Sequence, residues 1–220
     1  MLLYGHDTSP YVRRVRVLLR ELGVPFERDT DSWASPRLAA VNPLLRVPVL
    51  HDTARGQWLL DSRLIAAYLY DHLPGPAPAG ATPPIQPTLF RPAHRWDDEN
   101  LLLAIDAATD SAINVFLLER DGVPAASSPY LQRQQERVRS CLLHVEQRYA
   151  GRTTLGEGFL SFVDIALCCA LDWLRFRRRY PVEDHPGLMH VLQAHASRPS
   201  LAETHPERAA HTAPPTVQRP

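Results

Sequence analysis

The chain has 220 residues, of which 45% are hydrophobic and 22% charged, and these values are typical of one or two globular domains. All 24 basic residues are arginines, and they balance 24 acidic residues, so the net charge does not favour nucleic acid or an acidic membrane as a partner. Three cysteines, two of them adjacent, make a poor disulfide framework and suit a reducing compartment. The first residues lack the pattern of a secretory signal, so we expect a cytoplasmic protein that does not bind a membrane.

The first 73 residues alternate between strand-like and helix-like segments. A short apolar run at residues 2–5 precedes a helical pattern that begins at Pro10 and ends at Gly23. A strand, a short helix, a two-stranded hairpin and a longer helix follow, over residues 24–29, 35–43, 47–60 and 61–73. The order βαβ, short helix, ββα predicts an α/β domain with helices packed on a sheet.

The second half of the chain is separated from the first by a change in composition. Residues 74–87 are rich in proline, alanine and glycine and carry no charge, which is typical of a linker. An all-helical domain is expected over residues 88–205, with helices at 88–119, 129–149, 161–178, 186–196 and 199–205. Residues 206–220 are polar and proline-rich, and we expect a disordered tail.

The start of the first helix has two compatible interpretations. Ser9 stands at the N-cap position and Pro10 at the first helical position, so the segment forms a good helix start worth about 1 kcal/mol. The same start can hold an anion, because its unpaired N–H groups and the helix dipole favour negative charge, and a thiolate there would be stabilised. The local pattern alone does not choose between a cap and a binding site.

Three segments of the first half together resemble a known family. They are SPYVRRVRVLLRELGVPFE at 9–27, NPLLRVPVL at 42–50 and LLDSRLIAAYL at 59–69, and their order and spacing resemble the glutathione S-transferases. SFVDIAL at 161–167 resembles the capping segment of the family's core helix. The resemblance covers nearly the whole chain except the tail. It implies an α/β thioredoxin-like N-terminal domain at 1–73, followed by an all-α helical-bundle C-terminal domain at 88–205.

The resemblance implies a glutathione transferase that activates the thiol of bound glutathione for attack on a small apolar electrophile, with a role in detoxification. Glutaredoxins begin the corresponding helix with Cys-Pro-Tyr-Cys, whereas this chain has Ser9, Pro10, Tyr11 and Val12, which excludes dithiol exchange and a cysteine-type mechanism at this site. By resemblance, Ser9 donates a hydrogen bond to the glutathione sulfur. Such a bond would lower the thiol pKa by about one to two units, from ~8.5 toward ~7. Thr8 is the rival donor, and the cap pattern favours Ser9.

The segment around Pro48 is expected to bind the middle of the tripeptide. The resemblance implies a cis bond between Val47 and Pro48, with the Val47 backbone paired to the cysteinyl part of glutathione. The structural alternative is that Pro48 only begins an edge strand. Arg46 stands where relatives often carry lysine and could approach a ligand carboxylate. Leu45 replaces the usual glycine, so the sequence does not decide whether the backbone here follows the path found in relatives.

The helix at 61–73 begins with two polar residues. Either Asp61 or Ser62 can serve as its N-cap. The resemblance instead assigns Ser62 to the γ-glutamyl carboxylate of glutathione and Asp61 to the α-ammonium group.

The first helix also carries a cluster of arginines. Arg13, Arg14 and Arg16 are expected to be solvated and paired with carboxylates such as Glu21.

In the family, the electrophile lies between the two domains. One candidate lining residue is near Ser9 and four are in the helical domain: Tyr11, His94, Trp96, Asn100 and Trp173. Tyr11 also fits the apolar stripe of its helix, and spacing does not choose among the other four.

Other motifs are interpreted as structural. Ser161 and Asp164 form a Ser-x-x-Asp capping pattern that starts a core helix. The ten histidines lack a metal-binding spacing, and GEGFLS at 156–161 lacks the third glycine of a dinucleotide motif, so neither a metal nor a nucleotide cofactor is expected. The basic run RFRRR at 175–179 suits a helix C-terminus rather than nucleic acid.

The resemblance implies a homodimer whose ligands are glutathione and a small hydrophobic electrophile. Two alternatives stay open from the sequence. One is a glutathione-dependent isomerase, dehalogenase or peroxidase that uses the same site. The other is a non-catalytic, transferase-like binding or regulatory protein.

Overall fold

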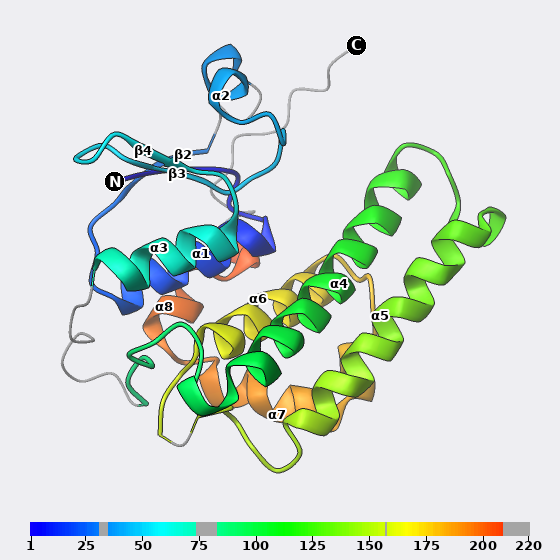
Figure 1. The fold of residues 1–220 in the computed structure, drawn as a ribbon. Helices are drawn as coiled ribbons and strands as arrows, with labels where there is room; N and C mark the ends of the chain where they lie inside the picture. Colours follow the sequence, from blue (N-terminus) through cyan, green and yellow to red (C-terminus); the bar gives the residue numbers. More distant parts are fainter. Residues whose placement is uncertain (31–34, 74–82, 157, 209–220) are drawn as a thin grey trace. The chain divides into compact units, whose positions relative to one another are not determined.

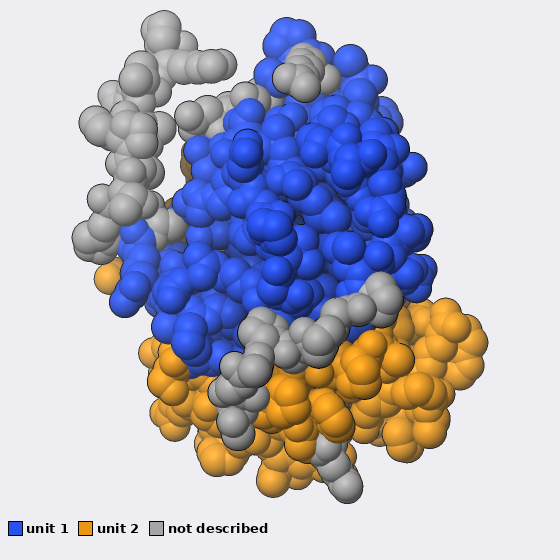
Figure 2. Space-filling model, turned by 90° about the vertical axis from the view of Figure 1, so that its left-hand side faces the viewer, with its two compact units in different colours: residues 1–81, 198–220 blue, residues 82–197 orange. Residues whose placement is uncertain are grey.

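The computed structural model describes residues 1–30, 35–73, 83–156 and 158–208. The chain divides into two compact units, which Figure 2 shows in different colours. Unit 1 comprises residues 1–81 and 198–220, and unit 2 comprises residues 82–197.

Unit 1 contains a four-stranded mixed sheet. Its strands are β1 (Leu2–Tyr4), β2 (Glu27–Asp29), β3 (Val49–Asp52) and β4 (Gln57–Leu59), in the order β2-β1-β3-β4. β1 pairs parallel with β2 and antiparallel with β3, and β3 pairs antiparallel with β4. The βαβ unit and the hairpin predicted from the sequence are therefore confirmed.

Helices cover both faces of this sheet (Figure 1). α1 (Pro10–Glu21) and α3 (Ser62–His72) lie side by side on one face, and the short α2 (Pro36–Val41) lies on the other. Leu38 of α2 packs against Tyr4 and Val49 of the sheet in a buried apolar cluster. The face of the sheet that α2 covers therefore has its own buried apolar cluster.

Unit 2 is helical, as predicted. Its helices are α4 (Arg95–Arg120), α5 (Pro129–Arg148), α6 (Phe162–Phe176) and α7 (Pro186–His195). α6 is the core helix, because every residue from Phe162 to Leu174 is buried. The segment Pro92–Arg120 is long and apolar enough to cross a membrane, but half of its most apolar stretch is buried in the protein, as in an ordinary core helix.

The unit boundaries differ from those expected in two places. Gln86 N–H donates to the Leu160 carbonyl at 2.8 Å and Ile85 is buried, so the end of the expected linker is part of unit 2. Residues 74–82 and 209–220 lie outside the described residues. At the other end, α8 (Pro199–Ala202) belongs to unit 1 and packs along α1, although the sequence placed it in the helical domain.

The arginines of α1 are buried, which corrects the expectation that they are solvated. Arg13, Arg14 and Arg16 are 2%, 3% and 6% exposed. Arg13 reaches the C-terminal segment, where its Nη2 donates to the Leu201 carbonyl at 3.1 Å and its Nε donates to Thr204 Oγ1 at 3.3 Å. A segment far along the chain therefore covers Arg13, which the local pattern had assigned to solvent.

Glu21 also has a different partner from the one expected. Its carboxylate accepts hydrogen bonds from Arg198 Nε at 2.7 Å and Arg198 Nη2 at 2.6 Å, and from the Ser200 hydroxyl. Glu21 is 5% exposed and Arg198 is 7% exposed, so this ion pair is buried. It fastens α8 to the end of α1 within unit 1.

Candidate functional site

The start of α1 has the cap geometry that the sequence predicts. Ser9 is the N-cap in extended backbone conformation, and its Oγ accepts a hydrogen bond from Val12 N–H at 3.3 Å. Ser9 is 6% exposed, and Pro10 occupies the first helical position. A hydroxyl that accepts one bond still has its own proton to donate. The cap therefore leaves Ser9 chemically able to donate to a ligand.

Gly5 brings the end of β1 close to α1 and to the segment before Pro48. A Cβ atom at Gly5 would lie 2.5 Å from Val12 Cγ2 and 3.0 Å from Val47 Cβ, and the φ angle of Gly5 is 137°. Both the crowding and the backbone angle require glycine here. The first turn of α1 and Val47 consequently approach each other across this residue.

The Val47–Pro48 peptide bond is cis, as expected. Before it, Leu45 has a φ of 50° and is 68% exposed. This left-handed conformation is one that glycine adopts readily, so leucine follows a glycine-like backbone path here. The Arg46 side chain is exposed, and its carbonyl accepts a hydrogen bond from the buried Asn42 Nδ2 at 2.8 Å.

The start of α3 resolves the choice of its cap. Asp61 is the N-cap, and its Oδ1 accepts a hydrogen bond from Arg63 N–H at 2.7 Å. Ser62 is the first helical residue and is fully buried. The Ser62 hydroxyl is therefore not needed as the cap.

Arg14 connects the two helix starts. Its Nη2 donates to Ser62 Oγ at 2.6 Å, and its guanidinium lies over the Tyr11 ring at 4.7 Å from the centroid. Tyr11 is half-buried. Sequence reasoning missed this contact, because Arg14 and Ser62 are 48 residues apart and no local pattern pairs them.

The loop before Ser9 is anchored by charges. Asp7 accepts from Arg16 Nη1 at 3.0 Å and from Arg28 Nη2 at 2.7 Å. Burial lowers the pKa of Arg16 to about 10, and the charge of Asp7 acts in the opposite direction. In the same loop, Thr8 Oγ1 lies 3.5 Å from His6 Nδ1.

The candidate electrophile-binding residues of unit 2 have contrasting environments. His94, Trp96 and Asn100 are exposed near the start of α4, and Trp96 is 71% exposed. Trp173 lies on α6, is 4% exposed and packs edge-on against Phe116 with ring centroids 6.0 Å apart. Three of these side chains therefore offer accessible surface, while Trp173 packs as a core residue.

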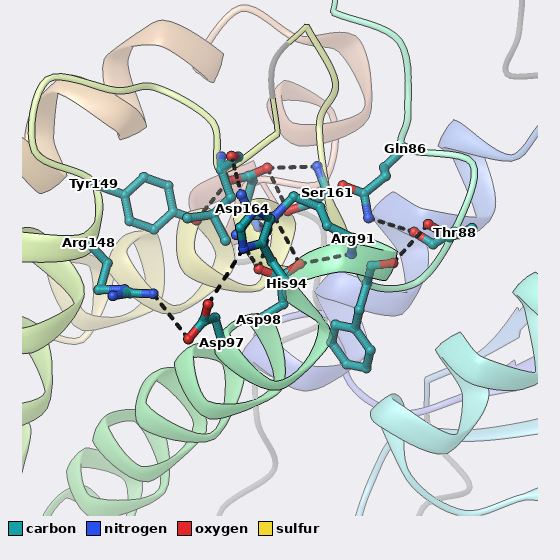
Figure 3. A network of polar contacts seen from close by, with 12 residues as sticks. Gln86, Thr88, Arg91, His94, Asp97, Asp98, Arg148, Tyr149, Ser161 and Asp164 are labelled. Atoms are coloured by element: carbon teal, nitrogen blue, oxygen red, sulfur yellow. Dashed lines mark hydrogen bonds and ion pairs between the residues drawn. The ribbon is translucent and has the colours of Figure 1, made fainter.

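Figure 3 shows the polar network around Asp164, also in unit 2. Ser161 and Asp164 form the predicted capping box at the start of α6. The fully buried Asp164 carboxylate also accepts from Tyr149 OH at 2.7 Å and Leu155 N–H at 3.0 Å. Burial raises the pKa of Asp164, while these hydrogen bonds favour its charged form. The network joins the residue after α5, the loop at Leu155 and the start of α6, so its role is structural.

Arg91 extends this network toward α4 (Figure 3). Its Nε donates to Asp98 Oδ2 at 3.1 Å, and its Nη1 donates to the Leu155 carbonyl at 2.9 Å.

Within the residues that the structure describes, no group of three or more histidine, cysteine, aspartate or glutamate side chains is placed to hold a metal ion.

The sequence matches two family descriptions. Residues 8–72 match "Glutathione S-transferase, N-terminal domain" and residues 103–199 match "Glutathione S-transferase, C-terminal domain". A curated relative is the uncharacterized GST-like protein YibF of Escherichia coli (strain K12). It is 33% identical over 218 residues, which cover 95% of this chain and 100% of that protein.

Solved structures with bound glutathione or a glutathione derivative are also similar. A glutathione S-transferase from Methylobacillus flagellatus KT with bound GSH is 26% identical, with a TM-score of 0.78 over 93% of this chain and 98% of that one. A glutathione S-transferase from Methylobacterium radiotolerans in complex with glutathione sulfonate is 25% identical, with a TM-score of 0.79 over 99% and 98%.

Proposed function

Because this chain belongs to the glutathione S-transferase family, we propose that it is an enzyme that binds reduced glutathione in unit 1 and activates its thiol for attack on an electrophile. One observation carries the proposal: the three segments of the expected tripeptide site are joined by contacts within unit 1. Gly5 lets the first turn of α1 meet Val47, and Arg14 links α1 to Ser62 at the start of α3.

The start of α3 is the proposed site for the γ-glutamyl group. Ser62 binds the carboxylate through its hydroxyl and backbone N–H, since the N-terminus of an eleven-residue helix favours an anion. Asp61 is exposed beside it and attracts the α-ammonium group. The remainder of the tripeptide pairs with the Val47 backbone just before β3, beside Pro48. The exposed Arg46 side chain approaches a ligand carboxylate.

In this arrangement, Ser9 acts on the cysteinyl sulfur. Its hydroxyl donates a hydrogen bond to the thiolate, and the start of α1 adds the attraction of a helix N-terminus. Loss of the thiol proton to solvent gives a sulfur nucleophile, which forms a C–S bond while the leaving group departs from the electrophilic carbon with its electron pair. A hydrogen bond to a charged group, at about 1.5–3 kcal/mol, would lower the thiol pKa by about one to two units.

The electrophile is proposed to be small and apolar. Tyr11, which is half-buried in the first turn of α1, is its proposed contact in unit 1. We propose a cytoplasmic homodimer as the working form. Light scattering of the purified chain tests the dimer, and conjugation assays with a panel of chlorinated nitroarenes, alkyl halides and epoxides test the electrophile class.

Retention on immobilised glutathione tests the proposed function. The full chain is expected to bind the resin and to elute with free reduced glutathione, and a Ser62→Ala variant is expected to bind less. A folded protein that flows through the resin and conjugates none of the panel would contradict the proposal.

A further inference from the structure

A buried arginine lies directly behind the proposed carboxylate site. Arg14 is 3% exposed, and its Nη2 donates to Ser62 Oγ at 2.6 Å. Ser62 is fully buried and is the first residue of α3. A guanidinium keeps its charge at any ordinary pH and is costly to bury, so Arg14 places a permanent positive charge beside this serine.

The direction of this hydrogen bond determines what Ser62 can do. A guanidinium only donates, so Ser62 Oγ must be the acceptor in the contact with Arg14. The hydroxyl proton of Ser62 is not used in this contact and is available to a different acceptor. A carboxylate at the start of α3 can accept this proton together with the helix N–H groups, and the nearby positive charge strengthens both interactions.

We propose that Arg14 is a positioning residue for the γ-glutamyl carboxylate of glutathione. It orients the Ser62 hydroxyl toward that carboxylate and supplies positive charge behind it, so the site selects peptides that carry a free carboxylate at this end. The inference rests on the proposed function, because it assigns a cause of specificity to the same site. The competing explanation is a purely structural link between α1 and α3.

Two ligands separate these explanations. Reduced glutathione carries the carboxylate, and 4-aminobutyryl-Cys-Gly is the same peptide without it. Calorimetric titration of the full-length Arg14→Gln variant is expected to show at least about tenfold weaker glutathione binding than wild type, because a charge-assisted interaction is lost. Its affinity for the analogue should stay within about twofold, because that ligand cannot use the interaction.

Arg13 provides the matched control. It lies on the same helix and is 2% exposed, but it donates to Leu201 and Thr204 rather than to Ser62. Arg13→Gln is expected to lower the melting temperature while leaving the ratio of the two affinities unchanged. In turnover assays, Arg14→Gln should raise KM for glutathione and leave kcat nearly unchanged, which a general loss of folding would not produce.

Arg14→Lys keeps the charge and is a second variant should Arg14→Gln not fold. It is expected to preserve part of the preference for glutathione over the analogue. The ratio of its two affinities should lie between the ratio of wild type and that of Arg14→Gln. If wild type binds glutathione but the Arg14 variants weaken both ligands equally, or neither, Arg14 is only a structural link and the inference is overturned. If wild type binds neither ligand, the proposed function itself fails.

Discussion

Replacing Ser9 with alanine separates its observed role as a helix cap from its proposed role as a donor to the glutathione thiol. The chain contains a matched control, because α2 also begins with a Ser-Pro pair. Ser35 Oγ accepts a hydrogen bond from Leu38 N–H at 3.2 Å, against 3.3 Å for Ser9 and Val12 N–H. Ser35→Ala therefore removes an equivalent cap outside the proposed site.

The two roles of Ser9 predict effects of different kinds. Loss of either cap should lower the free energy of unfolding by about 1 kcal/mol. Loss of the hydrogen bond to the thiolate, at about 1.5–3 kcal/mol, should raise the pKa of the bound thiol by about one to two units. Less thiolate is then present at neutral pH, so turnover falls about tenfold or more and partly recovers as the pH is raised through the new pKa.

Denaturant unfolding measures the first effect, and the ultraviolet absorbance of the thiolate in the glutathione complex, followed against pH, measures the second. We expect Ser9→Ala and Ser35→Ala to lose similar stability and only Ser9→Ala to shift the thiol pKa. Thr8→Ala tests the rival donor and should leave the thiol pKa unchanged. An unaltered thiol pKa and turnover in Ser9→Ala would refute the assigned role.

Three further substitutions test the packing. Glu21→Gln should lower the free energy of unfolding by about 3 kcal/mol in denaturant titrations, since the charge of Arg198 stays buried without its carboxylate; a loss below about 1 kcal/mol would argue against this ion pair. Asp164→Ala should lower it by about 3 kcal/mol or more, because the cap and buried donors lose their acceptor. Its turnover per folded molecule should be unchanged, and a specific loss would indicate a chemical role. Leu45→Gly should leave the free energy of unfolding unchanged or raise it by up to about 1 kcal/mol, because it relieves a left-handed φ at an exposed side chain; marked destabilisation would contradict that view.

Features determined by neighbouring residues could be predicted from the sequence. The caps at Ser9 and Ser161 depend on residues three positions further on, and both were found as expected. The cis bond at Pro48 was predicted from the resemblance, since an isolated X–Pro pair gives it only a low probability.

Features determined by distant segments could not be predicted in this way. Arg13 contacts residues 188 and 191 positions away, so its burial depends on where the C-terminal segment packs. The same packing buries Glu21 with Arg198, and it places α8 in unit 1. Helical periodicity located each helix, although the helix expected over residues 88–119 begins at Arg95, and it carried no information about which unit would receive α8.

Within the site, the types of residue could be predicted but their connections could not. Asp61 and Ser62 were equivalent as caps in the sequence, and the backbone at the start of α3 decides for Asp61. That outcome leaves the Ser62 hydroxyl to Arg14, a contact between segments 48 residues apart. The link from one helix start to the other therefore emerges only from the fold.

Titration of the full chain with reduced glutathione in a calorimeter, paired with thermal melts, tests the central claim most directly. The account predicts measurable heat, one site per chain, and a melting temperature that rises with ligand concentration. At one hundred times Kd, bound glutathione should add about 2.7 kcal/mol to the free energy of unfolding. Cys-Gly, which lacks the γ-glutamyl group, should bind far more weakly. The absence of both heat and a melting shift at millimolar glutathione would contradict the account.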